Sequence, residues 1–216
     1  MKHITDSQGL ALPTVLAMLA LTSMAALLAW RNLWVNDQLL NAQADLLRTQ
    51  HKAQAVLPMA LADIVGNPNT SDATATLRHT AGDATLTHAF FPQTLSDYDL
   101  LRQRLTANGV PCSAGICAPV ALNVNAAQAS YWKAQTATAV AVGAADNPYG
   151  SNTAWYWVEV FPRANTANPG ASFVYRITAL ATGVMPGSSV VLQAVWTRQS
   201  DTAPTGQWHS WHVLHD

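Results

Sequence analysis

Charged residues are scarce in this chain of 216 residues. Asp, Glu, Lys and Arg make up 11% of it, whereas a typical soluble domain carries roughly 25%. The 11 basic and 12 acidic residues leave a formal net charge of −1. That balance excludes the one-sided basic patch of nucleic-acid-binding proteins, so we predict no direct nucleic-acid binding. It also excludes a charge-rich disordered chain, and the length allows a core without metals or many disulfides.

Cysteine is equally scarce, with Cys112 and Cys117 as the only two. A structural zinc site needs four ligands, and the chain has no second cysteine pair. The spacing also differs from the CxxC redox motif. In an exported domain we expect the two cysteines to form a local disulfide that fixes a surface loop. Closing so small a loop contributes about 2 kcal/mol in the chain-entropy model.

Catalytic motifs are missing as well, and we predict that the chain is not an enzyme. It has no Gly-x-Ser-x-Gly, no phosphate-binding glycine loop and no His-Glu-x-x-His. Glu159 is its only glutamate, and no constellation of aspartates suggests acid–base chemistry. We therefore predict no catalytic residue and no cofactor.

Three histidines near the C-terminus recur at three-residue spacing: His209, His212 and His215. On a helix this spacing can place metal ligands on one face. The alternative is a polar tail in which Trp208 and Trp211 pack down. We favour the tail and predict no metal site.

What the chain does have is a long uncharged run at residues 10–30. As a helix it spans about 31 Å, close to the hydrocarbon thickness of a bilayer. A short polar segment ending in Gly9 precedes it. A secretory signal peptide needs a small-x-small site after the run, and Trp30 and Arg31 stand there instead. The remaining readings are an uncleaved membrane anchor and a leader cut before the run, and the glycine directly before the run favours the cut leader.

An apolar helical pattern continues beyond the run. Leu33, Leu40 and Leu47 recur every seven residues, which predicts a stripe that packs on the following domain or, less favoured, on a coiled-coil partner. Pro58 should kink or interrupt this helix, and Gly66 should end it. The predicted organisation is a leader at 1–9, a membrane or filament-core helix at 10–30, its extension at 31–65 and an extracytoplasmic domain at 66–216.

The remainder predicts an antiparallel sheet. Aromatic and β-branched residues indicate strands at 154–161, 172–180 and 190–198, joined by connections short enough for antiparallel pairing. A further strand is predicted at 85–91 and short helices at 96–105 and around Tyr131. Trp155, Trp157 and Trp196 are expected to serve as core or subunit contacts rather than as a sugar-binding platform. The fold class is therefore α+β, with a long N-terminal helix on an antiparallel sheet.

Two regions together resemble a known family. The first is Gln8 and Gly9 leading into the apolar helix. The second comprises residues 155–159, 175–179, Gly183 and 190–196. The chain resembles PilX-type minor pilins of type IV pili over about half its length, and residues 66–150 resemble nothing we can name. The resemblance implies the pilin-like fold already predicted.

The resemblance also implies processing and partners. A prepilin peptidase would cut between Gly9 and Leu10 and methylate the new N-terminus. Major pilins have glutamate at the fifth mature position, which here is Thr14, and PilX-type pilins also tend to lack it. Expected partners are other minor pilins, the major pilin, the inner membrane, the peptidase and a large pilus-tip adhesin. The protein would cross the inner membrane once with its C-terminal domain in the periplasm and then move to the pilus surface.

The missing glutamate suggests a position in the filament. In the family model this carboxylate pairs with the N-terminal amine of the subunit above. A subunit with Thr14 cannot offer that bond, which matters least at the tip. We therefore expect a tip or priming complex that supports adhesion and twitching motility. The alternatives are a type II secretion minor pseudopilin and a membrane-anchored periplasmic binding domain unrelated to pili.

Overall fold

The computed structural model describes residues 11–65, 78–80, 87–89, 91–92, 94–107, 111–119, 121–143, 154–163, 172–200 and 203–216. Its internal contacts divide the chain into two units, Met1–Ala44 and Asp45–Asp216. Helix α1 (Ala11–Val65) begins in the first unit and ends in the second. Each unit is described below by itself.

The first unit consists, where it is described, of the apolar part of α1. This helix is long and apolar enough to cross a membrane, judged by its length and composition. Side chains from 12 to 43 are exposed. The hydroxyls of Thr22 and Ser23 donate to carbonyls of the preceding turn, including that of Leu19, so they need no outside partner. Its chemistry is therefore that of a membrane-compatible helix.

The second unit is built on a seven-stranded sheet with the order β3-β4-β6-β7-β8-β9, to which β5 adds by pairing with β6. Its strands are β3 (Cys112–Ser113), β4 (Ile116–Cys117), β5 (Val140–Val142), β6 (Ala154–Pro162), β7 (Phe173–Thr182), β8 (Ser189–Arg198) and β9 (Gly206–Leu214). All pairs are antiparallel except β4 with β6. A separate antiparallel pair joins β1 (Arg78–Thr80) and β2 (Thr87–Ala89). The predicted antiparallel sheet and the α+β class are confirmed.

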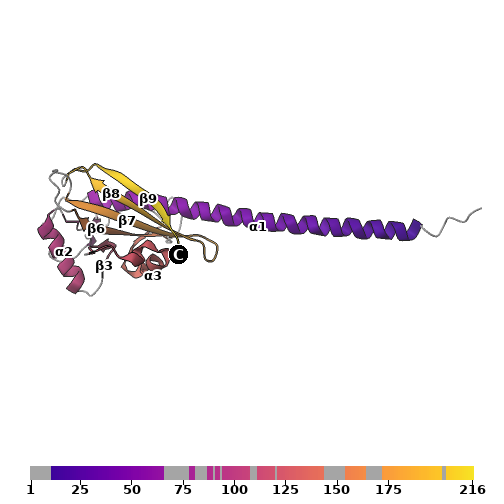
Figure 1. Ribbon diagram of the computed structural model, residues 1–216, viewed down its shortest axis with the longest axis horizontal. Coiled ribbons are helices and arrows are strands. Elements are labelled where there is room, and N and C mark those ends of the chain that lie inside the picture. The colour runs from indigo at the N-terminus through magenta and orange to yellow at the C-terminus, as the bar shows by residue number, and fades with distance from the viewer. Residues whose placement is uncertain are drawn as a thin grey trace, which may run out of the picture. The chain divides into compact units, whose positions relative to one another are not determined.

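One face of this sheet packs on the last turns of α1 (Figure 1). Val56, Ala60 and Ile64 of the helix join the same core as Tyr175 and Ile177 of β7. Helix α2 (Leu95–Ala107) adds its buried apolar residues to that core. At the start of α2 the backbone N–H of Asp97 donates to the Thr94 hydroxyl. This bond belongs to a reciprocal cap, which fixes where the helix begins. This cluster is the larger of the two cores in the described chain.

The other face is covered by a short helical segment, η2 (Val124–Ala127), α3 (Ala129–Ala134) and η3 (Thr136–Thr138). Trp132 of α3 is 1% exposed, and its ring centroid lies 5.0 Å from that of Trp157. The Trp132 indole N–H donates to the carbonyl of Ala126 at 2.9 Å. Trp157 donates its indole N–H to the Thr138 hydroxyl, so both of these indoles have a hydrogen-bond acceptor.

The leucine stripe of α1 does not pack as predicted. Leu33, Leu40 and Leu47 are 68%, 62% and 56% exposed. Buried positions begin at Asp45 and continue on the helix side that includes Thr49, Lys52, Ala53, Val56, Leu57, Ala60 and Ile64. The contact stripe therefore starts with polar residues, which a search for leucine does not detect.

The predicted interruption of α1 at Pro58 and the predicted C-terminal tail do not occur. The helix continues unbroken through Pro58, which is exposed. Residues 206–214 form strand β9 rather than a tail, and Trp208 and Trp211 stay 46% and 48% exposed. Strands β3, β4 and β5 were not predicted because each is only two or three residues long.

Candidate assembly surfaces

The predicted processing site, Gly9 and Leu10, lies outside the described residues. Thr14 stands on the exposed apolar part of α1. In the described part of this helix the first charged residue is Arg31 and the first carboxylate is Asp37. The described helix surface around Thr14 therefore carries no charged group.

Three polar residues of α1 hold the turn between β7 and β8. The Asp45 carboxylate accepts hydrogen bonds from the backbone N–H groups of Val184 and Met185, both at 3.1 Å. One and two turns further along the helix, Thr49 is 1% exposed and the Lys52 ammonium donates to the Thr182 carbonyl at 3.2 Å. We call Asp45, Thr49 and Lys52 the polar clamp. It is where the sheet-packed part of α1 begins.

Gly183 is part of the same contact. A Cβ atom at this position would lie 2.6 Å from the Thr49 hydroxyl and 2.5 Å from that of Ser188, so a side chain here would have to displace these groups. The two backbone N–H groups lower the pKa of Asp45 below its ordinary value of 3.8, because hydrogen bonds to a carboxylate favour its charged form. Sequence reasoning singled out Gly183 but missed Asp45. The available signal was the spacing of polar residues at 45, 49 and 52 within an otherwise apolar helix.

Cys112 and Cys117 are joined by a disulfide across the β3–β4 hairpin. The hairpin turn uses Ala114 at φ 50° and Gly115 at φ 76°. Gly115 donates to the carbonyl of Thr138 and accepts from the N–H of Val158, both at 2.7 Å. Both cysteines are buried, so the disulfide links the two strands of the β3–β4 hairpin at an edge of the sheet rather than fixing a loose surface loop.

The only glutamate of the chain, Glu159, lies buried on the sheet opposite Arg176. Arg176 donates to both carboxylate oxygens, at 2.5 Å from Nε and 2.7 Å from Nη2. Its guanidinium also lies 5.1 Å from the ring centroid of Phe161. Burial raises the pKa of Glu159, and the bonds from Arg176 oppose that rise. The pair is fully engaged within the protein, which points to a structural role.

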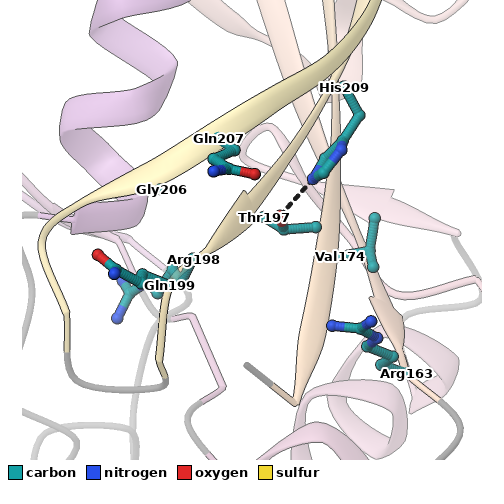
Figure 2. Close-up of a pocket in the computed structure, with 8 residues that line it drawn as sticks. All are labelled: Arg163, Val174, Thr197, Arg198, Gln199, Gly206, Gln207 and His209. Atoms are coloured by element: carbon teal, nitrogen blue, oxygen red, sulfur yellow. Dashed lines mark hydrogen bonds between the residues drawn. The ribbon is translucent and has the colours of Figure 1, made fainter. Parts of the chain in front are cut away.

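A cavity of about 650 Å³ lies at the strand ends (Figure 2). It is lined by Arg163, Val174, Thr197, Arg198, Gln199, Gly206, Gln207 and His209. His209 shares a hydrogen bond of 2.6 Å with the Thr197 hydroxyl. Arg198 donates to the Ile64 carbonyl in the last turn of α1, a favourable place for a cation. The lining is polar and basic, but Arg198 is already used in holding α1.

The C-terminal histidines do not form the helical metal face that their spacing allowed. His209 and His212 belong to strand β9, and His215 follows it. The carbonyl of His215 accepts the N–H of Ala129, and the Asp216 carboxylate binds Lys133 at 3.0 Å. Among the described residues no group of three or more His, Cys, Asp or Glu is placed to hold a metal. These last residues instead attach the chain end to the start of α3.

Comparison with known families decides the class of this domain. Residues 104–198 match the family described as "Type IV pilus assembly protein PilX C-term". This match supports a PilX-type pilin. No curated protein and no solved structure matches the chain. The PilX region includes the disulfide hairpin, the α3 cover and strands β6 to β8, and ends before β9.

The PilX match associates this chain with type IV pilus assembly. Members of this family are structural rather than catalytic. The apolar helix α1 is consistent with membrane anchoring.

Proposed function

We propose that the protein is a minor pilin, processed between Gly9 and Leu10, that helps to start type IV pilus assembly. The observation that supports this most is the combination of a PilX domain with an exposed apolar helix. In this proposal residues 10–30 cross the inner membrane before assembly and enter the filament core afterwards. Residues 31–65 extend the helix, and 66–216 form the periplasmic domain that becomes the pilus surface.

The absence of a carboxylate near Thr14 supports a position at or close to the tip. A buried carboxylate in a filament core is costly unless a cation pairs with it. A subunit that offers none cannot bind the N-terminal amine of a subunit above it. Its own amine still reaches a glutamate of the subunit below. The loss is therefore smallest for a subunit with nothing above it.

The proposed partners follow from that position. They are the other minor pilins and the major pilin along the helix, the prepilin peptidase during processing, and a large adhesin above the tip. Adhesion and twitching motility would then depend on this protein through the number of pili and through their tip. No nucleic-acid binding and no catalysis is part of the proposal.

The first test is mass spectrometry of the intact protein and its N-terminal peptide, in cells with and without the host's prepilin peptidase. We expect a mature chain that begins at methylated Leu10 only when the peptidase is present. An intact leader in both strains would refute the pilin proposal and leave a membrane-anchored binding domain. A processed chain recovered with a type II secretion machine instead of pili would identify a pseudopilin.

The second test concerns the tip. Sheared pili carrying an epitope-tagged chain are examined by immunogold electron microscopy, with the Thr14→Glu variant beside the wild type. We expect label at filament ends for the wild type, and additional label along the shaft for Thr14→Glu, which restores the carboxylate. Wild-type label spread evenly along the shaft would contradict the tip position but not the pilin class.

A further inference from the structure

The two edges of the main sheet differ sharply. One edge is β3, a strand of two residues closed by the disulfide hairpin. The other is β9, a strand of nine residues that pairs with β8 on one side only. Within the described part of the chain no strand pairs with the outer side of β9. On that side the backbone N–H and C=O groups of β9 take part in no pairing with another described strand.

The side chains of β9 are divided between the two faces of the sheet. Trp211 lies opposite Ala194, and Trp208 opposite Trp196. Both partners belong to the core that contains α1, so the two indoles are on that side. Ser210 and His212 lie on the other side. The edge therefore has one side with both indoles, while the other side carries Ser210 and His212 and, at the strand end, the buried Leu214.

Most of the usual protections of an edge strand are absent from β9, and one irregularity is present. Natural edges carry lysines, prolines or inward-pointing charges that prevent pairing with other chains. Residues 206–214 contain no proline and no Asp, Glu, Lys or Arg. The single irregularity is a register shift at Val195 and Trp196, which leaves residues 210–214 in regular pairing. Trp211, in the middle of this open stretch, is 48% exposed.

We propose that the β9 edge receives an extended segment of a neighbouring pilus subunit, which adds a strand to the sheet along residues 210–214. The regular row of backbone donors and acceptors matches another extended chain. Because β9 carries no Asp, Glu, Lys or Arg, we expect the side of that segment which contacts Trp208 and Trp211 to be uncharged and apolar. This inference rests on the proposed pilin function for the identity of the partner, and it assigns the contact surface itself.

The experiment uses the full chain in its host cells. A photo-crosslinking amino acid replaces Trp208 or Trp211 in turn, and exposed Leu100 of α2 or exposed Leu122 in matched controls. We expect a cross-link from position 208 or 211 to another pilin, at about tenfold higher yield than from the controls. Mapping the cross-linked peptide then identifies the partner segment.

Backbone pairing is tested on the wild-type chain purified in detergent with the partner so identified. Amide hydrogen exchange should slow at alternate residues of 210–214 when the partner is bound, because only every second N–H points outward. The variant Trp211→Lys should lower partner recovery about tenfold, while the matched Leu122→Lys leaves it unchanged. The exchange measurement needs no variant and so does not depend on whether Trp211→Lys folds.

Several outcomes would overturn the inference. A cross-link from position 211 to the chain's own residues means that the edge is covered internally. A processed chain without β9 cross-links, or exchange unchanged by the partner, refutes the edge contact and leaves the pilin function intact. An unprocessed chain whose β9 cross-links only to a non-pilus protein refutes both.

Discussion

The buried pair of Glu159 and Arg176 allows the sharpest quantitative prediction. Glu159 is 4% exposed and receives two charge-assisted hydrogen bonds from Arg176. Replacing Arg176 by Met leaves a carboxylate buried without its counter-ion. Breaking such a pair typically costs about 3–5 kcal/mol, which for a domain of this size lowers Tm by about 6–20 °C. Replacing both residues, as in Glu159→Leu with Arg176→Met, should restore stability to within about 1 kcal/mol of the wild type.

The pH dependence of this effect has a definite sign. Burial raises the pKa of Glu159 above its ordinary value of 4.5, and removing Arg176 removes the influence that opposes the rise. A carboxyl group with a raised pKa in the folded state favours folding while it is protonated. That contribution is complete below pH 4.5 and is lost as pH rises through the folded-state pKa. The stability deficit of Arg176→Met should therefore be largest near neutral pH and shrink towards pH 4.5.

The assay is guanidinium denaturation of the full chain in detergent, followed by tryptophan fluorescence, to which the buried Trp157 and Trp196 contribute. Three results would refute the reasoning: a deficit below about 1 kcal/mol for the single variant, a deficit that does not change with pH, or a double variant as unstable as the single one. The last would show that shape, rather than the unpaired charge, determines the loss.

Three further predictions concern the polar clamp, the disulfide and the Trp132 cover. Asp45→Asn should lower Tm by a few degrees at pH 7. Because the pKa of Asp45 is lowered in the folded state, the wild type loses this stabilisation as the pH falls below 3.8. The Tm values of the two proteins should therefore converge in acid. Replacing Cys112 and Cys117 by Ala should cost about 2 kcal/mol in equilibrium denaturation. Trp132→Ala should cost about 3–5 kcal/mol in the same assay, because it removes a ring that is 1% exposed.

Each of these has its own control. A gap between the Asp45→Asn and wild-type curves that persists unchanged in acid would show that the carboxylate charge is not what holds the turn. Reductant should destabilise the wild type but leave the cysteine-free variant unaffected. Substituting half-buried Tyr131, the neighbour of Trp132, should cost clearly less, and equal losses would mean that α3 as a whole is lost.

Much of the fold was predictable because local chemistry determines it. The uncharged run at residues 10–30 is long and apolar enough for a membrane-compatible helix, and long stretches of β-branched and aromatic residues such as 154–161 favour strands. The disulfide followed from there being two cysteines and a short loop. In a long helix or strand the pattern rests on many residues, so one atypical residue does not hide it.

The site residues depended more on tertiary structure. Asp45 is functionally informative only because the β7–β8 turn, far away in sequence, presents two N–H groups to it. Strand β9 was read as a polar tail because its histidines and tryptophans lack a simple alternation, and its pairing with β8 contains a register shift. Pairing with the long strand β8 stabilises β9 as a strand, although its own sequence does not favour one clearly.

By itself the sequence determined that this protein has an apolar helix before an antiparallel sheet, that it lacks a carboxylate at Thr14, and that its chemistry is not catalytic in any recognisable pattern. Tertiary structure alone decided which side of α1 faces the sheet, that Glu159 is neutralised by Arg176, and that β9 is left as an open edge. The physical reason is that composition and periodicity act within a few residues, whereas burial, charge pairing and strand order arise from contacts between residues distant in the chain.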